Sequence, residues 1–174
     1  SILKPNNSSG SKNVYLLQSL DDLNYYSKKI DDYSITEFLV GDEFTVDAIF
    51  NLNGRLIGYN TRLRKNFQSG ASQVSITSFH HGVENILSKF EKAQLIKGPV
   101  NFQFKYDKSG NISIFDLNPR LPSGGLPLTI KAGLDIPKIM IDILSGIEFK
   151  KPKMADKKIT MIRYFDELFV MEDD

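Results

Sequence analysis

The chain has 174 residues and a formal net charge of +1, from 22 lysines and arginines against 21 aspartates and glutamates. This length allows one domain with a sizeable core, or two small lobes. The balanced charge gives no reason to expect a nucleic acid or an anionic membrane as partner. The absence of cysteine excludes disulfides, zinc–thiolate sites and a cysteine nucleophile, and it fits a cytoplasmic location. No apolar run approaches the roughly 18 residues of a membrane span.

The first part of the chain is expected to mix short strands with one helix. Residues 2–4, 14–17 and 34–39 have the apolar character of strands. Ser19 is a suitable N-cap for a helix that runs to Lys29, because two aspartates in its first turn favour the helix dipole.

The middle of the chain predicts a hairpin and an amphipathic helix. Residues 43–51 alternate, with one apolar face made by Phe44, Val46, Ala48 and Phe50. Asn53-Gly54 is a hairpin turn signal, after which residues 55–63 return as a strand. Residues 65–72 are expected to be a polar loop. Residues 82–95 carry apolar side chains at helical spacing.

The last part predicts a second hairpin, a helix and a basic segment. Residues 100–106 and 112–118 are expected to pair around a turn. Asp135 caps a helix with apolar side chains from Ile136 to Leu144, which Gly146 ends. Residues 150–158 form a lysine-rich linker, and residues 159–170 add one or two strands. Neighbouring hairpins mixed with helices indicate an α+β fold, or a two-lobed arrangement of this kind.

The most informative stretch is Asp116 to Arg120, D-L-N-P-R, which precedes a glycine-rich loop. Asp116 and Asn118 are two residues apart, so in a strand they point to the same face. A carboxylate and an amide oxygen are hard donors, suited to Mg2+ or Mn2+. After Pro119 ends the strand, the Arg120 guanidinium offers a planar fork for phosphate or acyl-phosphate oxygens. A strand that simply runs into a turn is the alternative reading.

Gln103 joins this group only in one register of the second hairpin. With residues 108–111 as the loop, Gln103 lies opposite Asp116, and three oxygen donors share one face. The turn residues equally fit a bulged hairpin, which would shift the register by one and send Gln103 to the other face. The sequence leaves both registers open.

Two earlier segments carry residue types suited to a nucleotide. Lys4 precedes a loop of small residues, 8–12, where backbone N–H groups and an ammonium suit phosphate. An ordinary surface loop is the alternative. The segment Glu37 to Glu43, E-F-L-V-G-D-E, can offer backbone groups to a purine edge and a carboxylate to ribose hydroxyls. Two solvated glutamates beside a hinge are the alternative here.

Together these features resemble the ATP-grasp superfamily, in its carbamoyl-phosphate-synthase-like, carboxylate–amine ligase branch. The resemblance covers roughly residues 1 to 147 and implies two α+β lobes that hold Mg-ATP between them. The implied chemistry activates a carboxylate or bicarbonate to an acyl phosphate, which an amine then attacks. The matching landmarks are K-P with its loop (4–12), E-F-L-x-G-x-E (37–43), the strand with Gln103, and D-L-N-P-R-(x)4-G-L-P (116–127).

The resemblance also implies a role for each matching residue, from the phosphates to the adenine edge and the ribose. The implied nucleotide-binding residues are, in that order, Lys4 with Ser9, Gly10 and Ser11, then Glu37 with the backbone of Phe38 and Leu39, then Glu43. The implied magnesium ligands are Gln103, Asp116 and Asn118. Arg120 is the implied catalytic residue, which steadies the transferring group.

The sequence departs from the family pattern in its charges and its loops. Asp116 stands where a glutamate is usual and Gln103 is neutral, so the protein supplies one carboxylate to two metal ions. The loop at residues 69–72 lacks the histidine expected of a true synthase, which speaks against synthase activity itself.

We expect a piece of a longer ligase, whose missing amino-terminal domain is a partner beside small-molecule carboxylate and amine substrates. The expected division is a remnant of the smaller lobe (1–36), the carboxy-terminal ATP-grasp lobe (37–149), and a basic linker with terminal strands (150–174). Neither nucleic acid nor membrane is expected as a partner.

Some alternatives stay open. A non-catalytic nucleotide-binding or interaction module with the ATP-grasp shape is the second hypothesis. Arg62, Arg64 and Lys65 face either the acyl acceptor or phosphates, or else solvent at a strand edge. Residues 123–125 form either an anion site or a plain turn. The adjacent histidines, His80 and His81, diverge and make a poor metal pair.

Overall fold

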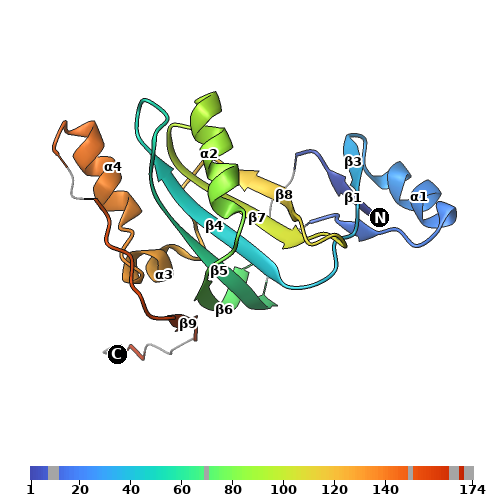
Figure 1. Ribbon diagram of the computed structural model, residues 1–174. Coiled ribbons are helices and arrows are strands. Elements are labelled where there is room, and N and C mark those ends of the chain that lie inside the picture. Colours follow the sequence, from blue (N-terminus) through green and yellow to red (C-terminus); the bar gives the residue numbers. More distant parts are fainter. Residues whose placement is uncertain (8–11, 69–70, 149–150, 165–168, 171–174) are drawn as a thin grey trace.

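The computed structural model describes the whole chain except residues 8–11, 69–70, 149–150, 165–168 and 171–174. Its described strands form two sheets, and every pairing among them is antiparallel, which confirms the α+β class (Figure 1). The small sheet has the order β2-β1-β3, with strands Tyr15–Leu16, Ile2–Pro5 and Tyr33–Thr36.

The large sheet has six strands in the order β8-β7-β4-β5-β6-β9. Two of its hairpins, β4–β5 and β7–β8, are the two that the sequence predicts. The strands are Ile112–Asn118, Gly98–Tyr106, Glu43–Phe50, Leu56–Gln68, Ala71–Ser78 and Thr160–Ile162, in the order of the sheet.

The helix after the small sheet's second strand is capped as the sequence predicts. Helix α1 covers Leu20–Tyr26, and a 3-10 turn, η1, continues it over Ser27–Lys29. The Ser19 hydroxyl accepts a hydrogen bond from the Asp22 backbone N–H, and the Asp22 carboxylate accepts one from the Ser19 backbone N–H. This reciprocal capping box satisfies two backbone donors at the helix start.

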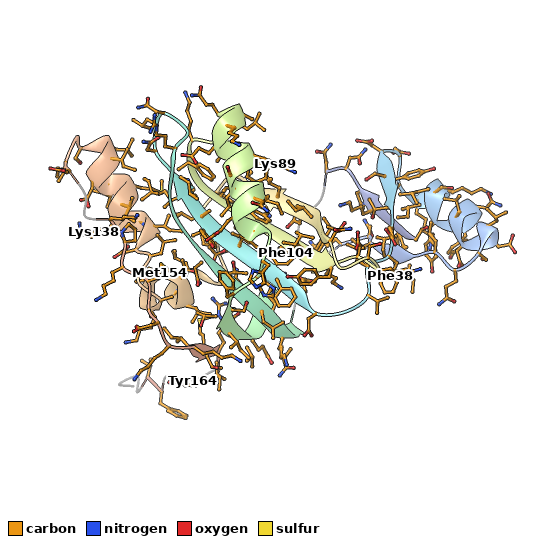
Figure 2. The ribbon with its side chains drawn as sticks, in the orientation of Figure 1. Phe38, Lys89, Phe104, Lys138, Met154 and Tyr164 are labelled. Atoms are coloured by element: carbon orange, nitrogen blue, oxygen red, sulfur yellow. The ribbon has the colours of Figure 1, made fainter. Side chains whose placement is uncertain are left out.

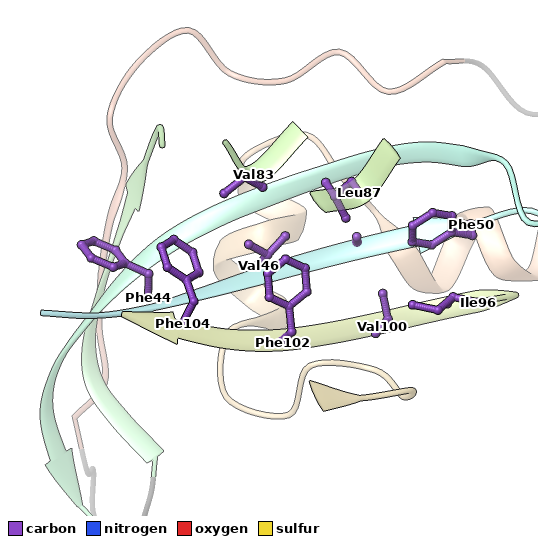
Figure 3. Close-up of a cluster of buried hydrophobic side chains, with 10 residues drawn as sticks. Phe44, Val46, Phe50, Val83, Leu87, Ile96, Val100, Phe102 and Phe104 are labelled. Atoms are coloured by element: carbon purple, nitrogen blue, oxygen red, sulfur yellow. The ribbon is translucent and has the colours of Figure 1, made fainter. Parts of the chain in front are cut away.

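One face of the large sheet is apolar and carries helix α2, Val83–Ala93 (Figures 1 and 3). The predicted alternation of β4 is confirmed, because its even-numbered side chains lie in this core. Val83 and Leu87 of α2 are fully buried against them. The buried members of this cluster are Phe44, Val46, Ala48, Phe50, Val83, Leu87, Ile96, Val100, Phe102 and Phe104.

A smaller cluster lies on the opposite side of the sheet, under helices α3 (Leu126–Lys131) and α4 (Ile136–Leu144). The Asp135 carboxylate accepts a hydrogen bond from the Lys138 backbone N–H, so the predicted cap of α4 is confirmed. Leu144 is 73% exposed, so its expected place in the apolar stripe is wrong. The buried members are Ile49, Leu134, Ile136 and Ile139.

The expected polar loop at residues 65–72 is wrong for most of its length. Strand β5 continues to Gln68 and β6 begins at Ala71, so a long hairpin replaces the loop. Strand β9 then pairs with β6, which confirms that a strand follows the lysine-rich segment. Strand β3 ends at Thr36, earlier than expected, and residues 37–42 connect the two sheets. No helix in the described residues is long and apolar enough to cross a membrane.

Candidate functional site

The candidate site lies on the face of the large sheet opposite α2, where polar side chains line up across neighbouring strands. In one row, Asn118, Asn101, Asp47 and Asn60 are cross-strand partners. In the next row, Asp116, Gln103, Thr45 and Arg62 are partners, and Glu43 and Arg64 form a third pair. We call these ten residues the polar face.

The register of the β7–β8 hairpin brings Gln103 directly opposite Asp116. Near the turn, Tyr106 pairs with Ile112, so the hairpin starts one residue out of the register that would pair residues 107 and 112. An irregularity between Gln103 and Phe104 then restores the register, and Phe115 bulges out with no cross-strand partner in β7. Both registers that the sequence allows are therefore present. The hairpin starts in the bulged register, and the irregularity at Phe115 returns it to the register that pairs Gln103 with Asp116. Gln103, Asp116 and Asn118 share one face as a result.

The three predicted metal ligands are brought together, with Asp116 as the one carboxylate among them. The Asn118 side-chain amide donates to Asp116 Oδ2 at 2.8 Å, and Gln103 Oε1 accepts from Arg64 at 2.7 Å. The part of the chain that the structure describes holds no cluster of three or more His, Asp or Glu side chains suited to a metal. Asp116 and Asn118 fit magnesium in the chemistry of their oxygens. Gln103 fits less well, because its oxygen already bonds a cation.

Arg64 links two predicted site residues. Its Nη1 atom donates to Glu43 Oε1 and to Gln103 Oε1, and its side chain is only 8% exposed. Burial lowers the pKa of the Arg64 guanidinium, while the nearby carboxylates of Glu43 and Asp116 oppose that shift and the charge of Arg62 adds to it. An arginine nevertheless stays charged at neutral pH. Arg64 is therefore a fixed positive charge beside the Asp116 carboxylate.

A buried ion pair lies deeper on the polar face. Arg62 Nε donates to Asp47 Oδ2 at 3.0 Å, and both side chains are at most 5% exposed. The Thr129 hydroxyl, from α3, donates to the same Asp47 oxygen at 2.6 Å and accepts from the Asn60 amide at 3.0 Å. This network anchors α3 over the sheet. The solvent-exposed alternative for Arg62 is wrong, because its side chain is buried and bonds Asp47.

The loop after β8 lies against the polar face, where a side chain of β7 bonds one of its backbone carbonyls. The Asn101 amide donates to the Arg120 carbonyl at 3.1 Å. The Arg120 guanidinium itself is exposed and donates to the Leu121 carbonyl at 3.2 Å. Gly125 packs so closely on Arg62 that an added Cβ would lie 1.9 Å from its Nε atom. The absence of a side chain at Gly125 thus allows the loop backbone to approach Arg62 closely.

Contacts between the two sheets involve other predicted residues. The Lys4 ammonium, from β1, donates to the carbonyl of the bulged Phe115 at 3.0 Å. The Lys105 ammonium donates to the Leu39 carbonyl at 3.2 Å. Phe38 lies between the sheets in the connecting segment, where it is 44% exposed (Figure 2). The predicted loop residues Ser9, Gly10 and Ser11 lie outside the described residues, and Glu37 is exposed.

Sequence reasoning gave no role in the site to five residues that the structure places there: Asp47, Asn60, Asn101, Lys105 and Thr129. A signal for four of them was available, since three strand segments each carry polar residues at alternate positions. Aligning the segments around residues 43–47, 60–64 and 101–105 would have predicted one polar face. Thr129 gave no such signal, because it lies in a short helix 82 residues after Asp47.

The family is established by its sequence model. The family described as "ATP-grasp in the biosynthetic pathway with Ter operon" matches residues 29–167, most of the chain. The chain therefore belongs to this ATP-grasp family. No curated protein sequence matches the chain significantly.

Solved ATP-grasp structures share the fold. The biotin carboxylase complex with β,γ-ATP from Campylobacter jejuni has a TM-score of 0.68 at 18% identity, over 88% of this chain and 39% of that one. The N5-carboxyaminoimidazole synthetase complexed with ADP from Staphylococcus aureus has a TM-score of 0.70 at 14% identity, over 94% and 46%. The L-amino acid ligase from Bacillus licheniformis has a TM-score of 0.59 at 16% identity, over 88% and 39%. The chain thus spans less than half the length of each.

Proposed function

We propose that this chain is part of an ATP- and magnesium-dependent ligase that activates a carboxylate, or bicarbonate, as an acyl phosphate for attack by an amine. The observation that carries the proposal is the β7–β8 register. It puts Gln103, Asp116 and Asn118 on one face, with Glu43 on the same face two strands away. A register slipped by one residue at this point would have scattered these oxygens and favoured a non-catalytic module.

In this proposal Asp116 and Asn118 hold the magnesium ion, with Gln103 beside them. The bound ion neutralises phosphate charge and orients the transferring phosphoryl group, which is most of what phosphoryl transfer requires of a protein. The exposed Arg120 guanidinium, one loop away, is free of carboxylate partners in the described residues and can turn toward the acyl phosphate.

The nucleotide would lie between the sheets. Glu37 and the backbone of Phe38 and Leu39 form the connecting segment, which suits the adenine edge. Glu43 begins β4 and suits the ribose hydroxyls. Lys4 already reaches β8 from the small sheet, which puts its ammonium near the proposed metal site.

The rest of the reaction is assigned to parts of the protein beyond this sequence. The structures that share the fold are more than twice as long as the matched region, so we propose that an amino-terminal domain supplies further contacts to carboxylate and amine. We also propose the lobe boundary at residue 36, where β3 of the small sheet ends.

The test is formation of an acyl phosphate by the full-length protein. ADP release is followed with Mg-ATP and a panel of carboxylates or bicarbonate, with hydroxylamine as a trap for the acyl phosphate. Carboxylate-dependent ADP release with hydroxamate formation supports the proposal. Saturable nucleotide binding without carboxylate-dependent turnover supports the alternative, a non-catalytic nucleotide-binding module. Two observations favour this alternative. Asp116 has a shorter side chain than the glutamate usual at this position, and Gln103 already accepts a hydrogen bond from Arg64.

A further inference from the structure

The polar face holds a positive charge where the family pattern leads one to expect negative charge. Of the three oxygen donors Gln103, Asp116 and Asn118, only Asp116 carries a charge, and a single carboxylate is little compensation for two divalent ions. The structure adds Arg64, whose guanidinium bonds Gln103 directly.

Arg64 is held in place from both sides. Its Nη1 atom donates to the Gln103 amide oxygen at 2.7 Å and to the Glu43 carboxylate, while 92% of the side chain is buried. The Asp116 carboxylate also stabilises its charge. A guanidinium with these partners is pre-organised, because little side-chain entropy remains to be lost when a ligand arrives.

The same contacts leave no favourable place for a divalent ion at Gln103. An ion bound to the Gln103 oxygen would displace the bond from Arg64 and lie next to its guanidinium, where like charges repel strongly in a partly buried setting. Phosphate oxygens, by contrast, are attracted to a guanidinium and accept its hydrogen bonds well.

From these contacts we infer that the site takes one divalent ion per nucleotide, at Asp116 and Asn118, and that Arg64 supplies the charge of a second ion to the phosphates. The inference rests on the proposed function and goes beyond it. It makes Arg64 a fixed charge that stabilises the phosphates electrostatically, and it explains why Gln103 can be neutral: its amide oxygen positions Arg64 rather than binding metal.

The first test counts metal ions in the full-length protein. Mn2+ is titrated in the presence of a saturating non-hydrolysable ATP analogue, and the free ion is measured by its electron paramagnetic resonance signal. We expect one Mn2+ per bound analogue. Two ions per analogue would overturn the inference while leaving the proposed function in place, whereas absence of analogue binding would overturn both. This count needs no variant, so it does not depend on whether a variant folds.

The second test changes the charges. Arg64→Met should weaken analogue binding about tenfold or more, as expected for loss of a fixed positive charge close to the phosphates. Arg64→Met combined with Gln103→Glu should raise the count to two ions. Arg55→Met, an exposed arginine at the other end of the β4–β5 hairpin, is the matched control and should bind as the parent does. Unchanged affinity in Arg64→Met, or one ion in the double variant, would contradict the inference. If Arg64→Met does not fold, Arg64→Lys keeps the charge and should retain one ion.

Discussion

The two faces of the large sheet are built from the same strands and have different physical characters. On the face under α2, aromatic and aliphatic side chains such as Phe102 and Val46 are fully buried. On the polar face, the same strands carry an ion pair at Asp47, a fixed cation at Arg64, and a half-buried carboxylate at Asp116. The apolar face stabilises the fold by burying hydrophobic surface, whereas the polar face holds charged side chains in fixed positions.

The polar face is itself graded from the centre of the sheet to its β8 edge. Asp47 and Arg62 are nearly inaccessible to solvent, and Asp47 anchors α3 through Thr129, so this pair stabilises the fold. Asp116 and Asn118 lie on the outermost strand and are more exposed. The difference separates polar residues that hold the fold from those that remain accessible to a ligand, and the following changes test that separation.

The largest effect is expected on the apolar face. Phe102→Ala removes a fully buried ring from the core and should lower the free energy of unfolding by about 3–5 kcal/mol. The measurement is chemical denaturation, with Phe79→Ala, a ring that is 67% exposed, as the control. A loss below about 1 kcal/mol for Phe102→Ala would mean that this face does not dominate stability.

The buried ion pair should come next. Asp47→Ala leaves Arg62 buried without its carboxylate and should cost about 3 kcal/mol of unfolding free energy. Combining Asp47→Leu with Arg62→Met removes both charges and should recover most of that loss. If the double variant is as unstable as the single one, the uncompensated charge is not the cause, and the distinction between the two parts of the polar face fails.

A smaller effect is expected where the loop after β8 packs on Arg62. Gly125→Ala forces a Cβ into the guanidinium and should cost about 1–3 kcal/mol of unfolding free energy. Gly124→Ala is the matched control, because no atom lies within 4 Å of its added Cβ. Equal melting temperatures for the two variants would show that the loop moves away from Arg62 easily.

The smallest effect concerns His80, at the edge of the apolar core. Its ring packs on Phe44 and its Nδ1 lies 2.8 Å from the Tyr106 hydroxyl, and burial lowers its pKa from the ordinary 6.5. The unfolded chain then binds the proton more readily than the folded chain. The stability that His80 contributes should therefore be fully present above pH 6.5 and should be lost as the pH drops toward the lowered pKa. Denaturation across this range should show the fall, and His80→Gln should remove it. A parent whose stability rises on acidification would contradict the sign.

Elements with a local signal were predictable from the sequence, and features set by distant contacts were not. The alternation of Phe44 to Phe50 and the caps at Ser19 and Asp135 depend on neighbouring residues, and the structure confirms them. The register of Gln103 was ambiguous because two one-residue irregularities cancel, and no local rule predicts the second. The partnership of Asp47 with Thr129 joins residues far apart in the chain.

Strand β6 was missed for a related reason. Its three serines favour a loop by composition, and they lie in a strand where β5 and β9 pair with β6 on either side. The role of Arg64 likewise follows from Glu43 and Gln103 meeting it from two different strands. Charged residues inside a sheet thus need the tertiary structure to be interpreted.

The most direct test of the account is calorimetric titration of the full-length protein with Mg-ADP, for the parent, Asp116→Ala and the control Asp156→Ala. Asp116 lies on the edge strand of the sheet and Asp156 in the exposed segment before β9. We predict saturable binding by the parent and by Asp156→Ala, and at least about tenfold weaker binding by Asp116→Ala with unchanged unfolding free energy. Equal binding by Asp116→Ala, or its failure to fold, would contradict the assignment of the polar face as the nucleotide–metal site.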